Sequence, residues 1–272
     1  MKCRALIPSL LFILVVASFL PAQTAPLSAN TRLTEILRLP ALQPGDWQGL
    51  FSIAESGDPE AQYWLGRIYE AGRLFPLDKQ KSAYWYQKSA EQGYAPAEYW
   101  VCGKRANNEP IESERCMWRA AENGVPEAQF WLGVAFEQNL WFGVTDQQEA
   151  LKWYKRAAER ELPDAENELG VRYQDGDGVE QNYVQAAYWF HKAAEHVPDL
   201  GGAGQGRNNL GNLYVEGRGV PRDYVQAYMW FSLANSDHNI EYLQREMTPA
   251  QILRAQSLAN EWTKQHPDPA IY

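Results

Sequence analysis

The sequence predicts an all-α protein, a solenoid of five helix-turn-helix repeats with capping elements at both ends. Three observations predict it. A leucine-glycine block recurs along the chain, a tryptophan-aromatic block follows each copy after about nineteen residues, and both blocks have the apolar spacing of a helix. The units start at residues 61, 97, 128, 165 and 206, and such a spacing is typical of stacked repeats.

The recurring blocks divide the chain into units. The first block reads AQYWLG from Ala61, AQFWLG from Ala128, AENELG from Ala165 and GRNNLG from Gly206. The second reads WYQKSAEQG from Trp85, WYKRAAERE from Trp153, WFHKAAEHV from Trp189 and WFSLANSDH from Trp230. A weaker copy joins AEYWVCG from Ala97 to CMWRAAENG from Cys116. We therefore place repeats at 61–96, 97–127 (degenerate), 128–164, 165–205 and 206–238.

Each unit is expected to be an antiparallel pair of helices. Ala165, Leu169 and Tyr173 are four residues apart and share one helical face, and the glycines of DGDGV and EGRGV can end a helix with a positive φ. The glycine after each leucine costs a helix about 1 kcal/mol relative to alanine, so it needs a reason. We expect close approach of the second helix's tryptophan.

The ends of the array need covers, because a terminal repeat exposes an apolar face. Upstream, residues 26–60 are expected to form a capping segment whose part from Asp46 to Ser56 copies the end of a second helix. Downstream, residues 239–272 are expected to form a C-terminal capping helix. Thr248, Pro249 and Gln251 form its predicted capping box.

Residues 1–25 read as a secretory signal peptide. Lys2 and Arg4 precede a short apolar run, and the small residues after it favour cleavage after Ala22 or Ala25. The alternative is an uncleaved membrane anchor, for which the run is short. After cleavage, we expect no membrane span.

Composition narrows the partners. With 25 lysine and arginine residues against 34 acidic ones, the net charge is −9, which argues against nucleic acid. Three cysteines and four histidines argue against a metal centre, and we expect no cofactor.

The repeats resemble the SEL-one-like repeat, a relative of the tetratricopeptide repeat. The family's pattern, A-x-x-x-L-G-x-x-Y-x-x-G-x-G-V, then aspartate or asparagine, then A-x-x-W-[YF]-x-K-A-A, is followed at nearly every position from Ala165 to Ala194. The resemblance covers residues 61 to 238. It implies a right-handed solenoid that binds protein partners, commonly in bacterial envelopes or in host contact, and no catalytic residue. The periplasm is therefore the expected location, with secretion or inner-membrane anchoring as alternatives.

The second unit departs most from the pattern. Cys102 replaces the glycine and Cys116 replaces the tryptophan, the two positions expected to touch. A disulfide between the paired helices fits an oxidising compartment, and family members with such bridges exist. Two buried free thiols and a redox role are the alternatives, the latter without a C-x-x-C motif.

Three motifs could carry chemistry, and each has a simpler interpretation. Gly201 to Asn209 has the glycine spacing of a phosphate loop, but it lacks the lysine and follows a helix, so we interpret it as a linker. Asp175 and Asp177 resemble part of a calcium loop but fit a turn. Some cysteine-rich relatives are linked to β-lactam chemistry, yet S-x-x-K and K-T-G are absent. We therefore expect no enzyme.

The face of each first helix that points away from its partner helix is the candidate binding surface. By analogy with tetratricopeptide arrays, it lines a concave groove. The predicted groove residues are Tyr63, Trp64, Arg67, Tyr99, Trp100, Phe130, Trp131, Asn167, Asn208 and Asn212. Aromatic residues dominate the first three units and asparagines the last two. Such a surface suits a protein or an extended, basic peptide with apolar anchors. The alternative is that the aromatic residues pack between units.

Together these features predict a non-catalytic scaffold or adaptor of the bacterial cell envelope that holds a protein or peptide in its groove. A periplasmic regulator of a signalling receptor is the alternative, followed by a β-lactam-interacting enzyme.

Overall fold

A computed structural model describes residues 44–72, 75–105, 110–140, 145–197 and 201–267 of the chain. These residues form thirteen helices and no strand, as the sequence predicts. The helices are α2 (Pro44–Glu55), α3 (Pro59–Ala71), α4 (Lys79–Ala90), α5 (Ala95–Arg105), α6 (Pro110–Glu122), α7 (Pro126–Gln138), α8 (Gln147–Ala158), α9 (Pro163–Asp175), α10 (Tyr183–Ala194), α11 (Gly202–Glu216), α12 (Tyr224–Leu233), α13 (Asp237–Glu246) and α14 (Pro249–Gln265). The predicted signal peptide lies outside the described residues.

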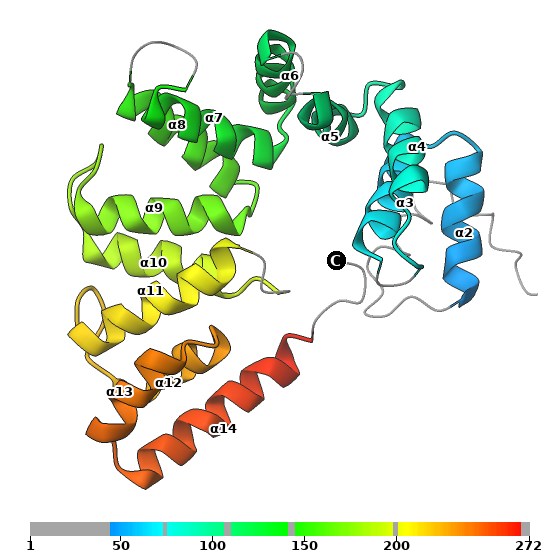
Figure 1. Ribbon diagram of the computed structural model, residues 1–272. Coiled ribbons are helices and arrows are strands. Elements are labelled where there is room, and N and C mark those ends of the chain that lie inside the picture. The colour runs from blue at the N-terminus through cyan, green and yellow to red at the C-terminus, as the bar shows by residue number, and fades with distance from the viewer. Residues whose placement is uncertain (1–43, 73–74, 106–109, 141–144, 198–200, 268–272) are drawn as a thin grey trace, which may run out of the picture.

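The helices pack as a solenoid of hairpins. The pairs α3–α4, α5–α6, α7–α8, α9–α10 and α11–α12 each form one unit, numbered 1 to 5 below, and the second helix of each unit packs on the first helix of the next. Helix α2 packs on α3 at one end, and α13 and α14 pack on α12 at the other. The units follow one another along a curved path, and α14 turns back towards the centre of the arc (Figure 1).

Repeated capping residues set where the helices begin. In four units the second helix starts after an aspartate or asparagine whose side chain accepts hydrogen bonds from two backbone N–H groups of the first turn. These N-caps are Asp78, Asp146, Asn182 and Asp223. The connecting turns before Asn182 and Asp223 contain glycines with positive φ, for example Gly176 at 78° and Gly217 at 71°. The repeat pattern therefore encodes its own helix boundaries.

The core of each regular unit is built around the leucine-glycine pair. Leu65, Leu132, Leu169 and Leu210 are at most 1% exposed. The expectation that the second helix's tryptophan approaches the glycine after each leucine is wrong. A Cβ atom on Gly170 would lie 2.4 Å from the ring of Phe190, the residue after Trp189. Gly66, Gly133 and Gly211 face Tyr86, Tyr154 and Phe231 in the same way.

The tryptophans point instead towards the second helix of a neighbouring unit. The ring of Trp153 in α8 packs on Trp118 in α6, with centroids 5.6 Å apart, and Trp85 in α4 packs on Phe51 in α2 at 6.4 Å. One residue along a helix is a rotation of about 100°, so adjacent aromatic residues serve different interfaces. The first ring joins neighbouring units and the second closes its own hairpin.

The substitution Gly170→Ala is expected to destabilise the protein by about 1–3 kcal/mol, because the added methyl group cannot coexist with the Phe190 ring in its present position. Urea unfolding measures this loss. Gly103→Ala is the matched control, since Gly103 is also helical but has nothing within 4 Å of its Cβ position. It should be neutral or stabilising because alanine is the better helix former. Equal stability of the two variants would contradict the close-approach explanation.

In units 1, 3 and 5 a buried polar side chain links the first helix to the helix before it. Gln62 donates from Nε2 to the Ala54 carbonyl at 2.9 Å, and Gln129 donates to the Ala121 carbonyl at 3.0 Å. In unit 5, Arg207 takes the same role and donates to the Ala194 carbonyl at 3.0 Å. Since the last carbonyls of a helix have no partner within it, these bonds satisfy the end of the previous second helix.

The C-terminal segment contains two helices where the sequence predicted one. The unpredicted α13 buries Leu243 completely against α12, with Ile240 and Met247 beside it. Helix α14 then begins at the predicted capping box, in which Thr248 and Gln251 bond reciprocally. Leu258 and Trp262 of its apolar stripe pack on the core cluster that units 4 and 5 share.

The interpretation of Gly201 to Asn209 as a linker is also wrong, because α11 starts at Gly202. A Cβ on Gly202 would lie 2.2 Å from the Pro163 carbonyl oxygen, and one on Gly206 would lie 2.7 Å from the Cβ of Ala193. These glycines permit α11 to pack closely on α9 and α10. A run of glycines reads as a linker in the sequence because their helical role depends on contacts with other units.

The cysteines of unit 2 lie at disulfide distance, with the Cα atoms of Cys102 and Cys116 6.0 Å apart. Within the described part of the chain, none of the helices has the length and apolar character that crossing a bilayer requires.

Candidate protein-binding surface

The predicted groove residues lie on the first helices of the units. In Figure 1, α5 and α7 lie nearer the centre of the arc than their partners α6 and α8. We call the exposed and half-exposed faces of α3, α5 and α7 the inner surface. It carries seven of the ten predicted groove residues, namely Tyr63, Trp64, Arg67, Tyr99, Trp100, Phe130 and Trp131.

Two of these rings, Tyr63 and Phe130, are partly buried by packing against other aromatic side chains. The Tyr63 ring lies 5.5 Å from both Tyr86 and Tyr94, so it joins its own hairpin to the start of the next unit. Phe130 lies 5.4 Å from Tyr154 in the equivalent place. Both residues are half-buried. The packing alternative therefore describes part of their role.

Trp100 packs between two units and also keeps part of its surface exposed to solvent. It stacks on Tyr86 of the preceding unit, with centroids 4.1 Å apart and planes at 26°, and its Nε1 donates to the Glu70 carboxylate at 3.1 Å. The Tyr86 hydroxyl donates to the same carboxylate at 2.9 Å. Trp100 is nevertheless only half-buried. Glu70 thus fixes the orientation of a ring whose remaining surface faces solvent.

Trp131 is the most accessible ring of the inner surface, with 47% of its surface exposed. Its ring contacts that of the neighbouring Phe130 edge to face, with the centroids 5.9 Å apart. On α3, the guanidinium of Arg67 lies 5.5 Å from the centre of the Trp64 ring. An exposed tryptophan beside half-buried aromatic rings is the composition of an anchor site for apolar side chains.

Charged side chains of units 1 and 3 shift the pKa values of tyrosines in units 1 and 2. Burial, the nearby Glu127 carboxylate and Tyr63 raise the pKa of the Tyr99 hydroxyl to about 12. Burial also raises the pKa of Tyr63, which Arg67 opposes and Glu127 and Glu70 reinforce. These tyrosines therefore stay neutral hydrogen-bond donors and acceptors at physiological pH, in a field set by Glu70, Arg67 and Glu127.

The asparagines predicted for the groove lie elsewhere, in units 4 and 5. Asn167 is 6% exposed, donates to the Gln205 side chain at 3.1 Å, and accepts from Asn209 at 2.9 Å. The side chain of Asn208 accepts from Asn239 of α13 at 3.3 Å, whereas Asn212 is exposed. The amides of Asn167 and Asn208 thus join successive elements, and the aromatic and asparagine ends do not form one continuous site of like chemistry.

Sequence inspection missed a charged cluster between units 3 and 4. Arg172 of α9 is 1% exposed, and its Nη2 lies 2.7 Å from Glu137 of α7 while its Nε lies 3.1 Å from Glu168. Asp177 and Gln147 lie 3.5 and 3.0 Å from Nη1. Burial raises the pKa of the Glu168 carboxyl, and Arg172 opposes this rise.

This cluster occupies the place that Trp100, Tyr86 and Glu70 occupy between units 1 and 2. Tyr154 donates to Glu137 at 2.8 Å, as Tyr86 does to Glu70, and the Arg172 guanidinium lies 4.8 Å from the Tyr154 ring centre. The charged residues therefore hold units together here, as the aromatic residues do at the other end. The one sequence signal was an arginine at a position where unit 1 has Ile68 and unit 5 has Leu213.

Hairpin repeats stacked into an arc, with an accessible aromatic inner surface, define an α-solenoid scaffold of the kind that binds other proteins. Comparison with known families agrees. The Sel1 repeat matches residues 59–94, 126–162, 163–196 and 205–237, just over half of the chain. The chain belongs to the Sel1 repeat family, whose members typically mediate protein–protein interactions and whose fold is typically a non-enzymatic scaffold.

Solved structures of bacterial proteins share the fold. A protective antigen of uropathogenic Escherichia coli with an SLR fold is 28% identical, with a TM-score of 0.59 over 81% of this chain and 49% of that one. A Sel1 repeat protein from Oxalobacter formigenes is 26% identical, with a TM-score of 0.52 over 82% and 71%.

Curated relatives are longer proteins. Chitin synthase regulatory factor 3 of Schizosaccharomyces pombe is 34% identical over 122 residues, which are 42% of this chain and 13% of that protein. DAP3-binding cell death enhancer 1 of Rattus norvegicus is 30% identical over 164 residues, 56% and 32% respectively. The chain thus spans a third or less of the length of these relatives.

Proposed function

We propose that this chain is a non-catalytic docking scaffold that binds a protein partner or an extended peptide along the inner surface of units 1 to 3. The observation that carries the proposal is Trp131, 47% exposed beside Phe130, at the repeat position that the half-exposed Trp64 and Trp100 hold in units 1 and 2. A rigid stack holds these rings in place before binding, so that association orders mainly the ligand.

The surrounding charges favour a ligand with basic residues between apolar anchors. Glu70 and Glu127 lie among the aromatic residues, and the chain carries a net charge of −9. The relatives support a role without catalysis, since their names describe regulators and a binding protein. In this proposal the chain acts by bringing another protein into place.

We further propose that the chain works outside the cytoplasm, with Cys102 and Cys116 bridged. The apolar run within residues 1–25, the Cα separation of 6.0 Å and the bacterial structural neighbours support this location. The bridge would hold together the unit that departs most from the repeat pattern.

Photo-crosslinking tests the inner surface. With p-benzoylphenylalanine in place of Trp131, we expect one protein partner to be captured in the cells that make this chain, and mass spectrometry to identify it. The same probe in place of Gln87, an exposed residue of α4, is the control. With the purified partner, Trp131→Ala should then weaken binding by about tenfold or more without changing the thermal midpoint. Equal crosslinking at both positions, or unchanged affinity of Trp131→Ala, would refute the proposal.

A further inference from the structure

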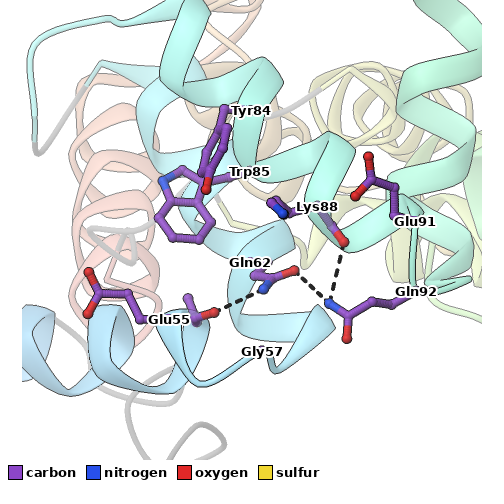
Figure 2. A pocket seen from close by; sticks show the side chains of 9 residues that line it. Glu55, Gly57, Gln62, Tyr84, Trp85, Lys88, Glu91 and Gln92 are labelled. Carbon is purple, nitrogen blue, oxygen red and sulfur yellow. Dashed lines mark hydrogen bonds between the residues drawn. The ribbon is translucent and has the colours of Figure 1, made fainter.

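A pocket of about 520 Å³ lies between α2 and α4, on the side of the second helices. We call it the outer pocket. Figure 2 shows the rings of Tyr84 and Trp85 on one side and a chain of hydrogen bonds on the other. In that chain, Gln92 donates to Gln62 at 2.8 Å, and Gln62 donates to the Ala54 carbonyl. The exposed residues Glu55, Lys88 and Glu91 also line the pocket.

The repeat places an equivalent position between α10 and α12, and there the chain fills it itself. Arg207 stands where unit 1 has Gln62, and it bonds to Ala194, the counterpart of Ala54. Trp230 stands where unit 1 has Trp85. The ring of Trp262, from α14, lies 4.9 Å from the Arg207 guanidinium and 6.2 Å from the Trp230 ring.

Trp262 lies on the amphipathic helix α14, and its ring also contacts a residue of its own helix. His266, one turn later, stacks on it with centroids 4.2 Å apart. The Trp262 ring packs against the core cluster that contains Ala194, Met229 and Trp230. This position between second helices therefore accepts an indole ring, presented by a helix that crosses the end of the array.

A third copy of the position, between α8 and α10, is polar and smaller. Its hollow measures about 180 Å³ and is lined by Glu166, Lys192 and His196 among others. The Glu166 carboxylate lies 2.8 Å from Nε2 of His196, so this pair takes the place of the Gln62–Gln92 pair. Of the two hollows, the outer pocket is the one with the volume and the aromatic wall that an indole requires.

We propose that the outer pocket binds a tryptophan side chain on an amphipathic helix of a partner protein, in the way that Trp262 of α14 occupies the equivalent position. The floor offers the amides of Gln62 and Gln92, and Trp85 offers an edge or face, as Trp230 does to Trp262. Glu55 and Glu91 at the rim favour a basic residue near the tryptophan, which α14 itself has in Lys264. The site is separate from the inner surface, so either can fail without the other.

The test uses the full chain and a fluorescein-labelled peptide of its own residues 248–267, titrated by fluorescence anisotropy. We expect saturable binding that is weakened at least about tenfold when the peptide carries Trp262→Ala, the size of loss typical of a central aromatic anchor. The chain's own α14 is tethered beside unit 5 at a high local concentration, which disfavours exchange with the peptide there.

Two protein variants locate the site. Lys88→Trp fills the outer pocket and should weaken peptide binding at least about tenfold, whereas Gln87→Trp, one residue away on the same helix and outside the pocket, should bind within about twofold of wild type. Glu91→Lys changes the rim charge with little change in volume, and it should weaken binding most at low salt. Trp131→Ala should bind as wild type does.

Absence of saturable binding would overturn the proposal, as would equal binding of the Trp262→Ala peptide or unchanged binding to both Lys88→Trp and Glu91→Lys. Circular dichroism shows whether each variant is folded, and Glu91→Lys decides the matter if Lys88→Trp is not. Binding that is lost only with Trp131→Ala would place the peptide on the inner surface and refute the outer pocket while leaving the proposed function intact.

Discussion

Replacing Arg172 by alanine should destabilise the solenoid by about 3–5 kcal/mol, the loss expected when one partner of a buried ion pair is removed. The guanidinium is 1% exposed and lies between Glu137 and Glu168, so its loss leaves two partly buried carboxylates facing each other. The same substitution removes the polar contacts of α9 with α7 and α8, which Arg172 makes through Glu137, Gln147 and the Tyr154 ring. Urea unfolding at pH 7 measures the effect.

Two comparisons separate this explanation from loss of packing alone. Arg218→Ala removes an exposed ion pair with Glu216, and it should cost no more than about 1 kcal/mol. The Arg172→Ala penalty should shrink as the pH falls towards 4, because burial raises the pKa of the Glu168 carboxyl and its protonation removes one of the charges that the substitution leaves unpaired. A penalty equal to that of Arg218→Ala, or one independent of pH, would show that the cluster does not hold units 3 and 4 together.

Loss of the proposed Cys102–Cys116 bridge should destabilise the protein by about 3 kcal/mol, the value expected from loop-closure entropy for a sequence separation of 14 residues. Cys102→Ser and Cys116→Ser should behave alike, and so should reduction of the wild-type protein. Thermal unfolding with and without reductant measures the loss. The double variant should show no further response to reductant.

The state of the thiols must be established in the same experiment. Mass spectrometry after alkylation should find Cys102 and Cys116 unmodified in unreduced protein purified from an oxidising compartment and modified after reduction. Alkylation of both without reductant would overturn the bridge. A bridge whose loss leaves the unfolding curve unchanged would show that it does not stabilise unit 2.

Two junctions between units, that of units 1 and 2 and that of units 3 and 4, are packed with different chemistry. Between units 1 and 2 the carboxylate of Glu70 holds two aromatic rings, Tyr86 and Trp100. Between units 3 and 4 the carboxylate of Glu137 holds Tyr154 and a buried arginine. The first arrangement leaves aromatic surface on the inner side, which is why we place the binding site in units 1 to 3.

The glycine contacts show where sequence reasoning reached the right pattern with a wrong partner. A helical glycine after a buried leucine indicates close approach, and the structure has that approach in four units. The partner is Phe190 and not Trp189, because a helix turns about 100° per residue and the two rings cannot both face the same hairpin. Only the stacking on the preceding second helix decides which ring faces where.

The residues that the sequence predicts for the groove differ in their exposure to solvent. The sequence predicted Trp131 and Trp100 as groove residues, and both keep solvent-facing area. It grouped Asn167 with them, although this residue is buried between α9 and α11. The outer pocket was not predicted, because its walls come from three different helices, α2, α3 and α4. The ligand that we propose for it is inferred from Trp262, which occupies the equivalent position and is far away in sequence.

The sequence alone determined the pairing of helices in the repeats, the capping box of α14 and the order of the hairpins, since these depend on residues within one or two turns: apolar spacing, an aspartate or asparagine before a second helix, and glycine after a first. The tertiary structure alone decided which units are joined by rings and which by charges, how α13 and α14 close the array, and where a pocket stays open. Those outcomes depend on side chains from successive units competing for the same space, and that competition is settled only when the units stack.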